Sequence, residues 1–199
     1  MDAKAWDARY AETELMWSVE PNQFVANECA DLPPGRALDL ACGEGRNAIW
    51  LARQGWDVTA SDFSAVALEK ARRLAGDLTL EWVVADATTW EPDGPYDLAV
   101  LAYLQLPADE RRAAVRHAFA ALGPGGTFLL VAHDTANLTD GTGGPQDAAV
   151  LMTVDDVLDD LADQDLEVVR AERVTRPVTG ADGTVRDALD ALVRVRRRG

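Results

Sequence analysis

A glycine-rich stretch, Gly43 to Ala48, could hold a cofactor that contains a nucleoside. Its letters, G-E-G-R-N-A, fit the pattern G-x-G-x-x-A, which joins a first strand to a first helix in dinucleotide-binding proteins. Glycine has no Cβ, so the backbone there can take positive φ and approach a ligand closely. Asp62 follows 19 positions after Gly43, at the end of a predicted strand. A carboxylate at that place can accept hydrogen bonds from the hydroxyls of a ribose.

Three features separate the two cofactors that fit this loop, NAD and S-adenosylmethionine (SAM). Asp39 lies near the carboxyl end of the first predicted strand, where its charge suits an ammonium and a sulfonium but not a pyrophosphate. Asp86, directly after the third strand, can accept a hydrogen bond from an adenine amino group. The sequence has no Tyr-x-x-x-Lys of the kind a dehydrogenase would need, since its only lysines are Lys4 and Lys70. SAM is therefore favoured.

His133 is the best placed candidate for a catalytic base. Methyl transfer from SAM is a one-step displacement that needs donor and acceptor aligned at about 3 Å with water excluded. A hydroxyl or amine acceptor would need a base, whereas a thiolate or selenolate would not. His133 ends the fifth predicted strand with Asp134 beside it, while His117 lies within a helix and is expected at the surface. Cys42 is expected to fill a tight loop rather than act as a nucleophile.

Short apolar strands alternate with amphipathic helices around these residues. Strands are predicted at 37–41, 56–62, 78–86, 96–104 and 127–133, and helices at 2–12, 21–32, 47–54, 64–75 and 107–122. This alternation is typical of parallel strands joined by right-handed crossovers, with helices on both faces of the sheet.

The last part of the chain has a different pattern. A helix at 153–163 begins with T-x-x-D, which resembles a capping box. Strands at 166–174 and 187–196 are separated by a polar turn, so we expect them to pair antiparallel. The expected fold class is α/β: a doubly wound, mainly parallel seven-stranded sheet with helices on both faces and a C-terminal antiparallel hairpin.

The segment 134–152 has no clear apolar period. Connections of this length in a compact domain are usually lids or binding loops, or are disordered. It follows the fifth strand on the side where ligands bind in open α/β sheets. It also contains Gly141, Gly143 and Gly144. We therefore expect a mobile loop that closes over the acceptor.

Composition and charge restrict the partners. A length of 199 residues is most simply one domain, and 19 Lys and Arg against 34 Asp and Glu give a net charge of −15. Such a surface repels phosphate groups, so nucleic acid and anionic membrane are not expected as partners. The basic residues near the end are expected to be a solvated strand end; they are Arg194, Arg196, Arg197 and Arg198. The N-terminal stretch lacks a signal-peptide pattern and only two cysteines occur, which favours a cytoplasmic monomer or homodimer.

Four elements resemble the class I SAM-dependent methyltransferases over residues 36–133. They are the stretch Leu38–Asn47, Asp62, Asp86 and the GPGG string before strand five. The strings C-G-x-G-R-N and W-D-x-R-Y, with the compact length and the D-G turn, also resemble the tellurite-resistance and thiopurine methyltransferase-like branch. Tellurite-resistance members have a histidine shortly before the final hairpin turn, where this chain has VTRPVTGADG. That departure disfavours tellurite as the acceptor.

The resemblance implies a single domain with a Rossmann-like methyltransferase fold. Its parts would be an N-terminal helical cap (1–35), a SAM-binding core (36–133), a lid or acceptor loop (134–152), and a helix with an antiparallel hairpin (153–199). It implies methylation of a small-molecule thiol, chalcogen, hydroxyl or amine, with SAM as cofactor and no metal. A non-catalytic SAM-binding module and an NAD-binding oxidoreductase are the alternatives.

The same resemblance assigns residues to the site. Those implied to bind the cofactor are Asp39, Ala41, Gly43, Gly45, Arg46, Asn47, Asp62, Phe63, Asp86, Ala87 and Leu101. Asp39 and the loop would hold the methionine part and Asp62 the ribose. Phe63 and Asp86 would meet the adenine. Those implied to cap the site or meet the acceptor are Trp6, Tyr10, Trp17, Tyr103 and Asp134, since aromatic faces favour a sulfonium.

Overall fold

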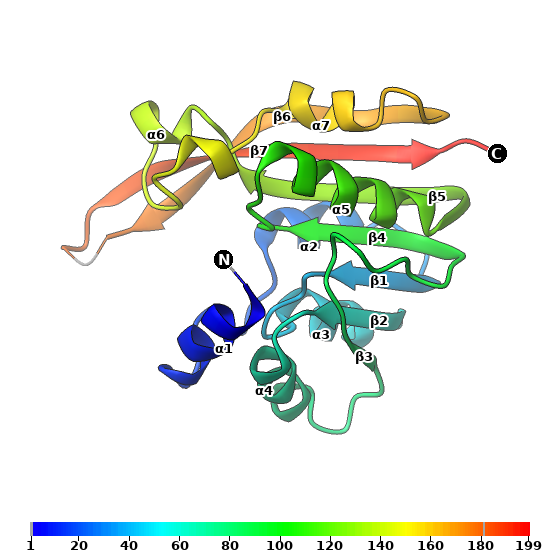
Figure 1. The fold of residues 1–199 in the computed structure, drawn as a ribbon, viewed down its shortest axis with the longest axis horizontal. Coiled ribbons are helices and arrows are strands. Elements are labelled where there is room, and N and C mark those ends of the chain that lie inside the picture. The colour runs from blue at the N-terminus through cyan, green and yellow to red at the C-terminus, as the bar shows by residue number, and fades with distance from the viewer. Residues whose placement is uncertain (1, 181) are drawn as a thin grey trace.

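A seven-stranded sheet forms the centre of the protein (Figure 1). The computed structural model describes residues 2–180 and 182–199. The strand order is β3-β2-β1-β4-β5-β7-β6. Strands β1 to β5 are parallel, and β7 pairs antiparallel with both β5 and β6. The predicted α/β fold, a doubly wound sheet closed by an antiparallel hairpin, is therefore confirmed.

The elements follow the predicted alternation. The parallel strands are β1 (Arg36–Leu40), β2 (Asp57–Asp62), β3 (Glu81–Val84), β4 (Tyr96–Ala102) and β5 (Leu122–His133). The hairpin consists of β6 (Leu166–Thr179) and β7 (Val185–Arg197). The main helices are α1 (Ala3–Ala11), α2 (Gln23–Cys29), α3 (Arg46–Arg53), α4 (Ala65–Ala75), α5 (Ala108–Ala120) and α7 (Val154–Asp160). A short helix, α6 (Asn137–Asp140), and a 3-10 turn (Ala148–Val150) lie between β5 and α7.

Two boundaries and one connection differ from prediction for identifiable reasons. β5 begins at Leu122 rather than at 127, because Leu122 pairs with Tyr96 and the GPGG string continues the strand. The second helix begins after Asn22, whose side chain accepts hydrogen bonds from the N–H groups of Phe24 and Val25. The connection 134–152 is not wholly irregular, since it contains α6 and the 3-10 turn. The predicted capping box of α7, formed by Thr153 and Asp156, is present.

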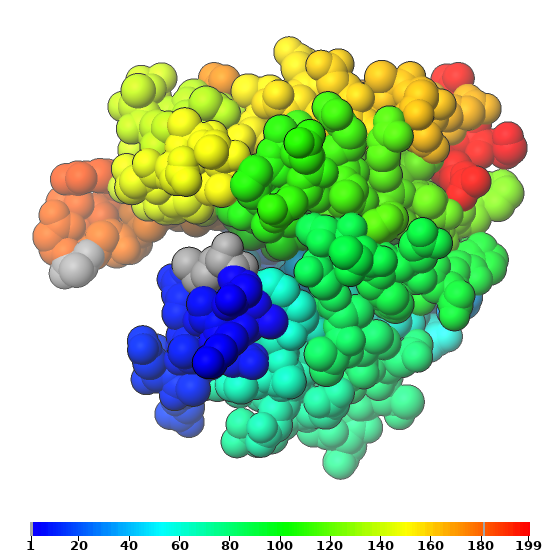
Figure 2. Space-filling model, viewed as in Figure 1, coloured from blue at the N-terminus to red at the C-terminus, as the bar shows by residue number. Residues whose placement is uncertain are grey.

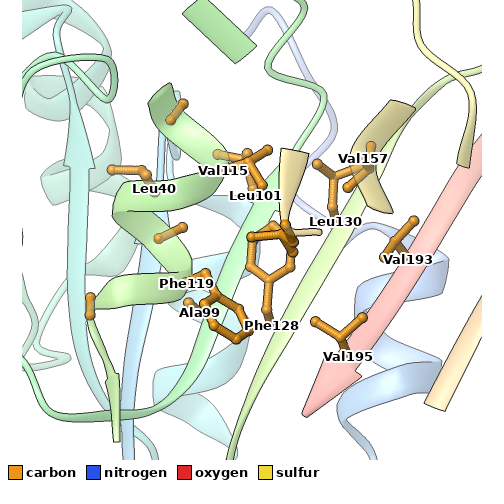
Figure 3. Close-up of a cluster of buried hydrophobic side chains, with 14 of the residues drawn as sticks. Leu40, Ala99, Leu101, Val115, Phe119, Phe128, Leu130, Val157, Val193 and Val195 are labelled. Carbon is orange, nitrogen blue, oxygen red and sulfur yellow. The ribbon is translucent and has the colours of Figure 1, made fainter. Parts of the chain in front are cut away.

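Helices cover the two faces of the sheet in separate groups. On one face α5 and α7 pack over β4, β5 and β7, and on the other α2, α3 and α4 pack over β1 and β2. Figure 3 shows the first of these cores, in which Phe119 of α5 lies beside Phe128 of β5. Burying a side chain of this size contributes roughly 1.5–3 kcal/mol. The sheet is thus a rigid platform for the loops at its carboxyl edge.

β6 is an edge strand with an interrupted outer side. Its pairing with β7 skips one residue between Val168 and Arg170, which marks a β-bulge. Pro177 lies further along the strand and has no N–H to donate. Among the described residues, none of the helices has the length and hydropathy needed to cross a membrane.

Two segments extend beyond the carboxyl edge of the sheet. α1 packs against α4, and the far end of the β6–β7 hairpin projects as an arm on the other side (Figure 1). Figure 2 shows a notch between the N-terminal segment and this arm. The predicted cofactor and acceptor residues lie at this edge of the sheet.

Candidate functional site

The loop between β1 and α3 is a tight turn tied to β2. Three of its residues have positive φ: Ala41 (59°), Gly43 (56°) and Gly45 (78°). This conformation is ordinary for glycine but uncommon for alanine. The Cys42 N–H donates to the Ser61 carbonyl at 2.8 Å, and the Gly43 N–H donates to Asp62 Oδ2 at 2.8 Å. The surrounding strands therefore hold the loop in shape.

Gly45 and Cys42 serve the packing of this loop. A Cβ on Gly45 would lie 2.8 Å from a ring carbon of Trp82 and 3.0 Å from Ala71 Cβ. The space left by its missing side chain is thus filled by protein, and its predicted cofactor contact stays a prediction for the backbone only. The Cys42 thiol is buried, and burial raises its pKa well above the ordinary value. Cys42 fills the loop, as expected.

Asp39 lies beneath the loop with one carboxylate oxygen unsatisfied. The side chain is buried and accepts a hydrogen bond from the Ala48 N–H at the start of α3. Among the described residues its Oδ2 has no hydrogen-bond partner. Burial raises the pKa of this carboxyl to about 7, although the Ala48 N–H and the Arg46 guanidinium oppose the rise. A buried acceptor of this kind favours a ligand that brings a donor.

Asp62 joins the cofactor loop to the start of α4. Its Oδ2 accepts from the Gly43 N–H, and its Oδ1 accepts from the Ser64 N–H at 2.9 Å. Burial raises the pKa of this carboxyl. A carboxylate has about four acceptor positions, so two remain for ribose hydroxyls. Phe63 is half-buried beside it, and the Ser64 hydroxyl donates to Asp7 at 2.5 Å.

A histidine of α5 contacts the segment that was predicted to meet the adenine. Asp86 Oδ1 accepts from the N–H and the hydroxyl of Thr88 at 2.8 and 2.7 Å. His117 Nδ1 lies 3.1 Å from the carbonyl oxygen of Ala87, so His117 is half-buried and engaged rather than a free surface residue. The Leu101 side chain lies in the core shown in Figure 3. Its predicted cofactor contact could therefore involve only its backbone.

The N-terminal aromatics gather over the cofactor loop. Tyr10 is buried, and its hydroxyl lies 2.9 Å from where a Cβ of Gly43 would be. That hydroxyl accepts from Trp17 Nε1 at 3.4 Å, while the Trp6 ring centre is 5.6 Å from that of Tyr10. The structure thus brings Tyr10 and Trp17 to the loop, with Trp6 packed on Tyr10.

Glu44 fastens this segment to the loop. Its buried carboxylate accepts from the N–H groups of Met16 at 2.9 Å and Trp17 at 3.0 Å. Lys70 Nζ donates to the same carboxylate at 3.1 Å. The second residue of the G-E-G string therefore holds the N-terminal segment in place.

Four side chains meet on the other half of the edge, and we name them the Asp190 cluster: Tyr103 directly after β4, His133 at the end of β5, Arg176 in β6 and Asp190 in β7. The Tyr103 hydroxyl donates to Asp190 Oδ2 at 2.7 Å. Arg176 Nε donates to the same oxygen at 2.9 Å and to the Tyr103 hydroxyl oxygen at 3.1 Å. His133 Nδ1 lies 3.2 Å from Asp190 Oδ1. Tyr103 has a φ of 58°, an outlier for an aromatic residue, and such strain is common at functional sites.

Burial and hydrogen bonding set the protonation states of Asp190 and Tyr103. Burial alone would raise the pKa of Asp190, but hydrogen bonds from His133, Tyr103 and Arg176 lower it overall. Asp190 is therefore ionised. Burial and the neighbouring Asp190 raise the pKa of Tyr103, which keeps its phenol neutral. His133 Nδ1 and Asp190 Oδ1 are both buried, and they face each other without another hydrogen-bond partner among the described residues.

Arg46 and Asn47 reach toward this cluster from α3. The Arg46 guanidinium carbon lies 6.0 Å from the centre of the Tyr103 ring, and burial lowers the pKa of Arg46. Asn47 is buried, and its Oδ1 accepts from the Asn22 N–H at 2.9 Å. Asn22 Nδ2 in turn donates to the Tyr103 hydroxyl oxygen at 3.3 Å. The Asn47 side chain thus links the N-terminal segment to α3, and its cofactor contact stays a prediction.

Asp134 is engaged within its own loop. Its side chain is buried, and Oδ1 accepts from the Ala136 N–H at 2.9 Å and from Arg173 Nε at 3.0 Å. These contacts close the turn after β5. The predicted meeting of Asp134 with the acceptor stays a prediction.

The rest of the loop is anchored by Asn137 and covers His133. Asn137 Oδ1 accepts from the Leu189 N–H, and its Nδ2 donates to the Gly143 carbonyl, both at 2.8 Å. A Cβ on Gly144 would lie 2.9 Å from three ring atoms of His133. The loop therefore lies against the candidate base, as expected of a covering segment, and its mobility stays a prediction.

Four residues that organise this edge were outside the predicted set: Asn22, Glu44, Arg176 and Asp190. Arg176 stands in the stretch where the resembled branch has its histidine, which was an available signal. Asp190 is the only charged residue between 188 and 193, an otherwise apolar stretch of strand. A lone carboxylate at a buried strand position predicts a partnered group.

Part of the chain matches a family model and several named methyltransferases. Residues 37–126 match a family model described as a methyltransferase domain. The chain is 34% identical over 124 residues to a demethylmenaquinone methyltransferase of Clavibacter sepedonicus, covering 61% of this chain and 49% of that protein. It is 37% identical over 141 residues to a trans-aconitate 2-methyltransferase of Streptomyces coelicolor, covering 64% and 45%. The chain thus spans about half the length of these relatives.

A solved structure matches nearly the whole chain. The subject of that structure is the conversion of a disulfide bond into a thioacetal group during echinomycin biosynthesis. The TM-score is 0.75 at 25% identity, with 98% of this chain and 92% of that chain covered. The similarity includes the N-terminal segment and the hairpin, which the family model does not reach.

Proposed function

We propose that this chain, which carries a class I SAM-dependent methyltransferase domain, transfers the methyl group of SAM to a small-molecule acceptor by direct displacement. The observation that carries the proposal is the loop of residues 41–45, set over Asp39 with its unsatisfied Oδ2. SAM supplies a methyl group made electrophilic by its sulfonium.

The residues present fit this cofactor. Asp39 Oδ2 would accept from the methionine ammonium, which is the donor that this buried oxygen lacks. Arg46, without a hydrogen-bond partner in the part of the chain that the structure describes, would pair with the methionine carboxylate. Asp62 would accept from the ribose hydroxyls, and the edge of Asp86 and Ala87 would meet the adenine. Each role is part of the proposal.

His133 is proposed as the base for a hydroxyl or amine acceptor. Asp190 would hold its Nδ1 proton, so that Nε2 takes the proton of the acceptor as the new bond forms. Tyr103 and Asn22 would position this pair, since both belong to the same hydrogen-bonded group. A soft thiolate acceptor would need no proton removed, and His133 would then act only in positioning.

We propose that the segments on either side of the site exclude water from it. The N-terminal segment, fastened by Glu44, would cover the cofactor, and the loop 134–152 would cover the acceptor. Keeping water out strengthens the interactions that align donor and acceptor. The division into cap (1–35), core (36–133), loop (134–152) and hairpin part (153–199) belongs to this proposal. So do a cytoplasmic location and a monomeric or homodimeric state.

Calorimetry and product detection test the proposal. Full-length protein should bind SAM and not NADH. Incubation of protein and methyl-labelled SAM with a small-molecule extract should then yield a labelled product by mass spectrometry. Protein lacking the Asp62 carboxylate (Asp62→Ala) is the control. SAM binding without any labelled product would indicate a non-catalytic binding module, and binding of NADH alone would indicate an oxidoreductase.

A further inference from the structure

Arg176 has hydrogen-bonding capacity that its protein contacts do not use. A guanidinium has five N–H donors, and Arg176 spends only the one on Nε, shared between Asp190 and Tyr103. Its Nη groups have no hydrogen-bond partner among residues 2–180 and 182–199. The side chain is 24% exposed. Donors are thus left at the surface of the Asp190 cluster.

Holding Asp190 does not require the Nη groups. Asp190 already receives the Tyr103 hydroxyl and Arg176 Nε on one oxygen, and lies near His133 Nδ1 on the other. A purely structural role for Arg176 would therefore be complete with Nε alone. The unused pair of Nη groups presents a flat, charged edge that matches the two oxygens of a carboxylate.

A second guanidinium approaches the same aromatic ring. The guanidinium carbons of Arg46 and Arg176 lie 6.0 and 5.6 Å from the centre of the Tyr103 ring. Repulsion from Arg176 contributes to lowering the pKa of Arg46. Asp190 offsets the charge of Arg176 and helps to raise its pKa, and in the proposed function the methionine carboxylate of SAM offsets that of Arg46. In a chain of net charge −15, two guanidinium groups beside one ring are a local concentration of positive charge.

We propose that the Nη groups of Arg176 bind a carboxylate of the methyl acceptor, so that the acceptor belongs to the small carboxylic acids. This inference rests on the proposed function, since it names the acceptor of that reaction. A carboxylate fits better than a phosphate because the ionised Asp190 beside Arg176 repels a dianion more strongly than a monoanion.

Binding to protein loaded with S-adenosylhomocysteine, the demethylated form of SAM, tests the inference. The probes are acetate, benzoate, inorganic phosphate and the neutral ester methyl benzoate, titrated by calorimetry. We expect at least one of the two carboxylates to bind more tightly than phosphate, and the neutral ester not to bind. Arg176→Met should weaken carboxylate binding by about 10- to 150-fold, the scale of hydrogen bonds to a charged group.

Matched variants separate recognition from folding. Arg176→Lys keeps a donor for Asp190 but loses the planar edge, so it should fold and still bind the carboxylate at least tenfold more weakly. Arg186→Met, on the same hairpin and exposed, should change nothing. Equal binding of acid and ester, tighter binding of phosphate, no binding of either carboxylate, or an unaffected Arg176→Met variant would each overturn the inference. Failure to bind S-adenosylhomocysteine at all would instead count against the proposed function.

Discussion

The two halves of the carboxyl edge are built in different ways. The cofactor half consists of the loops after β1, β2 and β3, and the Asp62 side chain holds its backbone turn within 50 residues of chain. The acceptor half is the Asp190 cluster, whose members come from β5, β6, β7 and the residue after β4 and span residues 103 to 190. One half comes from a short range of the sequence, and the other is assembled from distant side chains.

This difference determines how far a substitution in one half of the edge affects the other half. The cofactor half combines the backbone of the loop with the buried carboxylates of Asp39 and Asp62, neither of which belongs to the Asp190 cluster. A cluster of four side chains can change its ligand by one substitution. The cofactor half is therefore expected to tolerate variation in the acceptor half, and variants in one half should leave the binding function of the other nearly intact.

Asp62→Ala should have the largest effect and confine it to the cofactor half. The substitution removes the proposed ribose acceptor and releases the N–H groups of Gly43 and Ser64. We expect the SAM dissociation constant to rise by about 10- to 150-fold, measured by calorimetry. Asp57→Ala, at the exposed start of β2, is the matched control. Wild-type affinity in the Asp62 variant would remove the ribose assignment.

Asp190→Asn should act on the acceptor half alone. The variant leaves Arg176 without its charged partner and removes the carboxylate that faces His133 Nδ1 at 3.2 Å. We expect kcat/KM for the acceptor to fall by about 10- to 100-fold, with SAM affinity within about threefold of wild type. A loss of SAM affinity equal to that of Asp62→Ala would mean that the halves are not separable.

Replacing the loop tip should have a smaller effect of the same kind. Exchange of Thr139–Gln146 for a Gly/Ser linker removes the cover over His133 but keeps Asn137 and its bond to Leu189. We expect the acceptor KM to rise or kcat to fall several-fold in steady-state assays, and SAM affinity to change by no more than a few-fold. An unchanged rate would make the loop a passive connector.

The smallest effect is a pH dependence of the cofactor half through Asp39. Its pKa is raised to about 7 in the fold, so protonated Asp39 stabilises the free protein and that contribution is lost as pH rises through 7. The ionised form is the better partner for an ammonium, so SAM affinity should increase a few-fold across the same range. Asp39→Asn should flatten this calorimetric profile and raise the melting temperature above pH 7. If the substitution leaves the pH profile of SAM affinity unchanged, a group other than Asp39 is responsible for the titration.

The sequence was informative where function depends on short stretches and less so where it depends on tertiary assembly. The alternation of strands and helices, the loop after β1 and the position of Asp62 followed from apolar periodicity and glycine spacing over a few dozen residues. The roles of Asn22, Arg176 and Asp190 did not, because their contacts join residues up to 87 positions apart. His117 shows the same limit: its helix was predicted, but its bond to Ala87 depends on how that helix packs.

The interrupted outer side of β6 has a consequence for association between copies. A free edge of 14 residues could add a strand from a second molecule and so begin an aggregate. Pro177 offers no N–H to such a strand, and the bulge after Val168 bends the edge away from a straight ladder. Growth of the sheet from molecule to molecule is thereby opposed, and a homodimer would have to form through another surface.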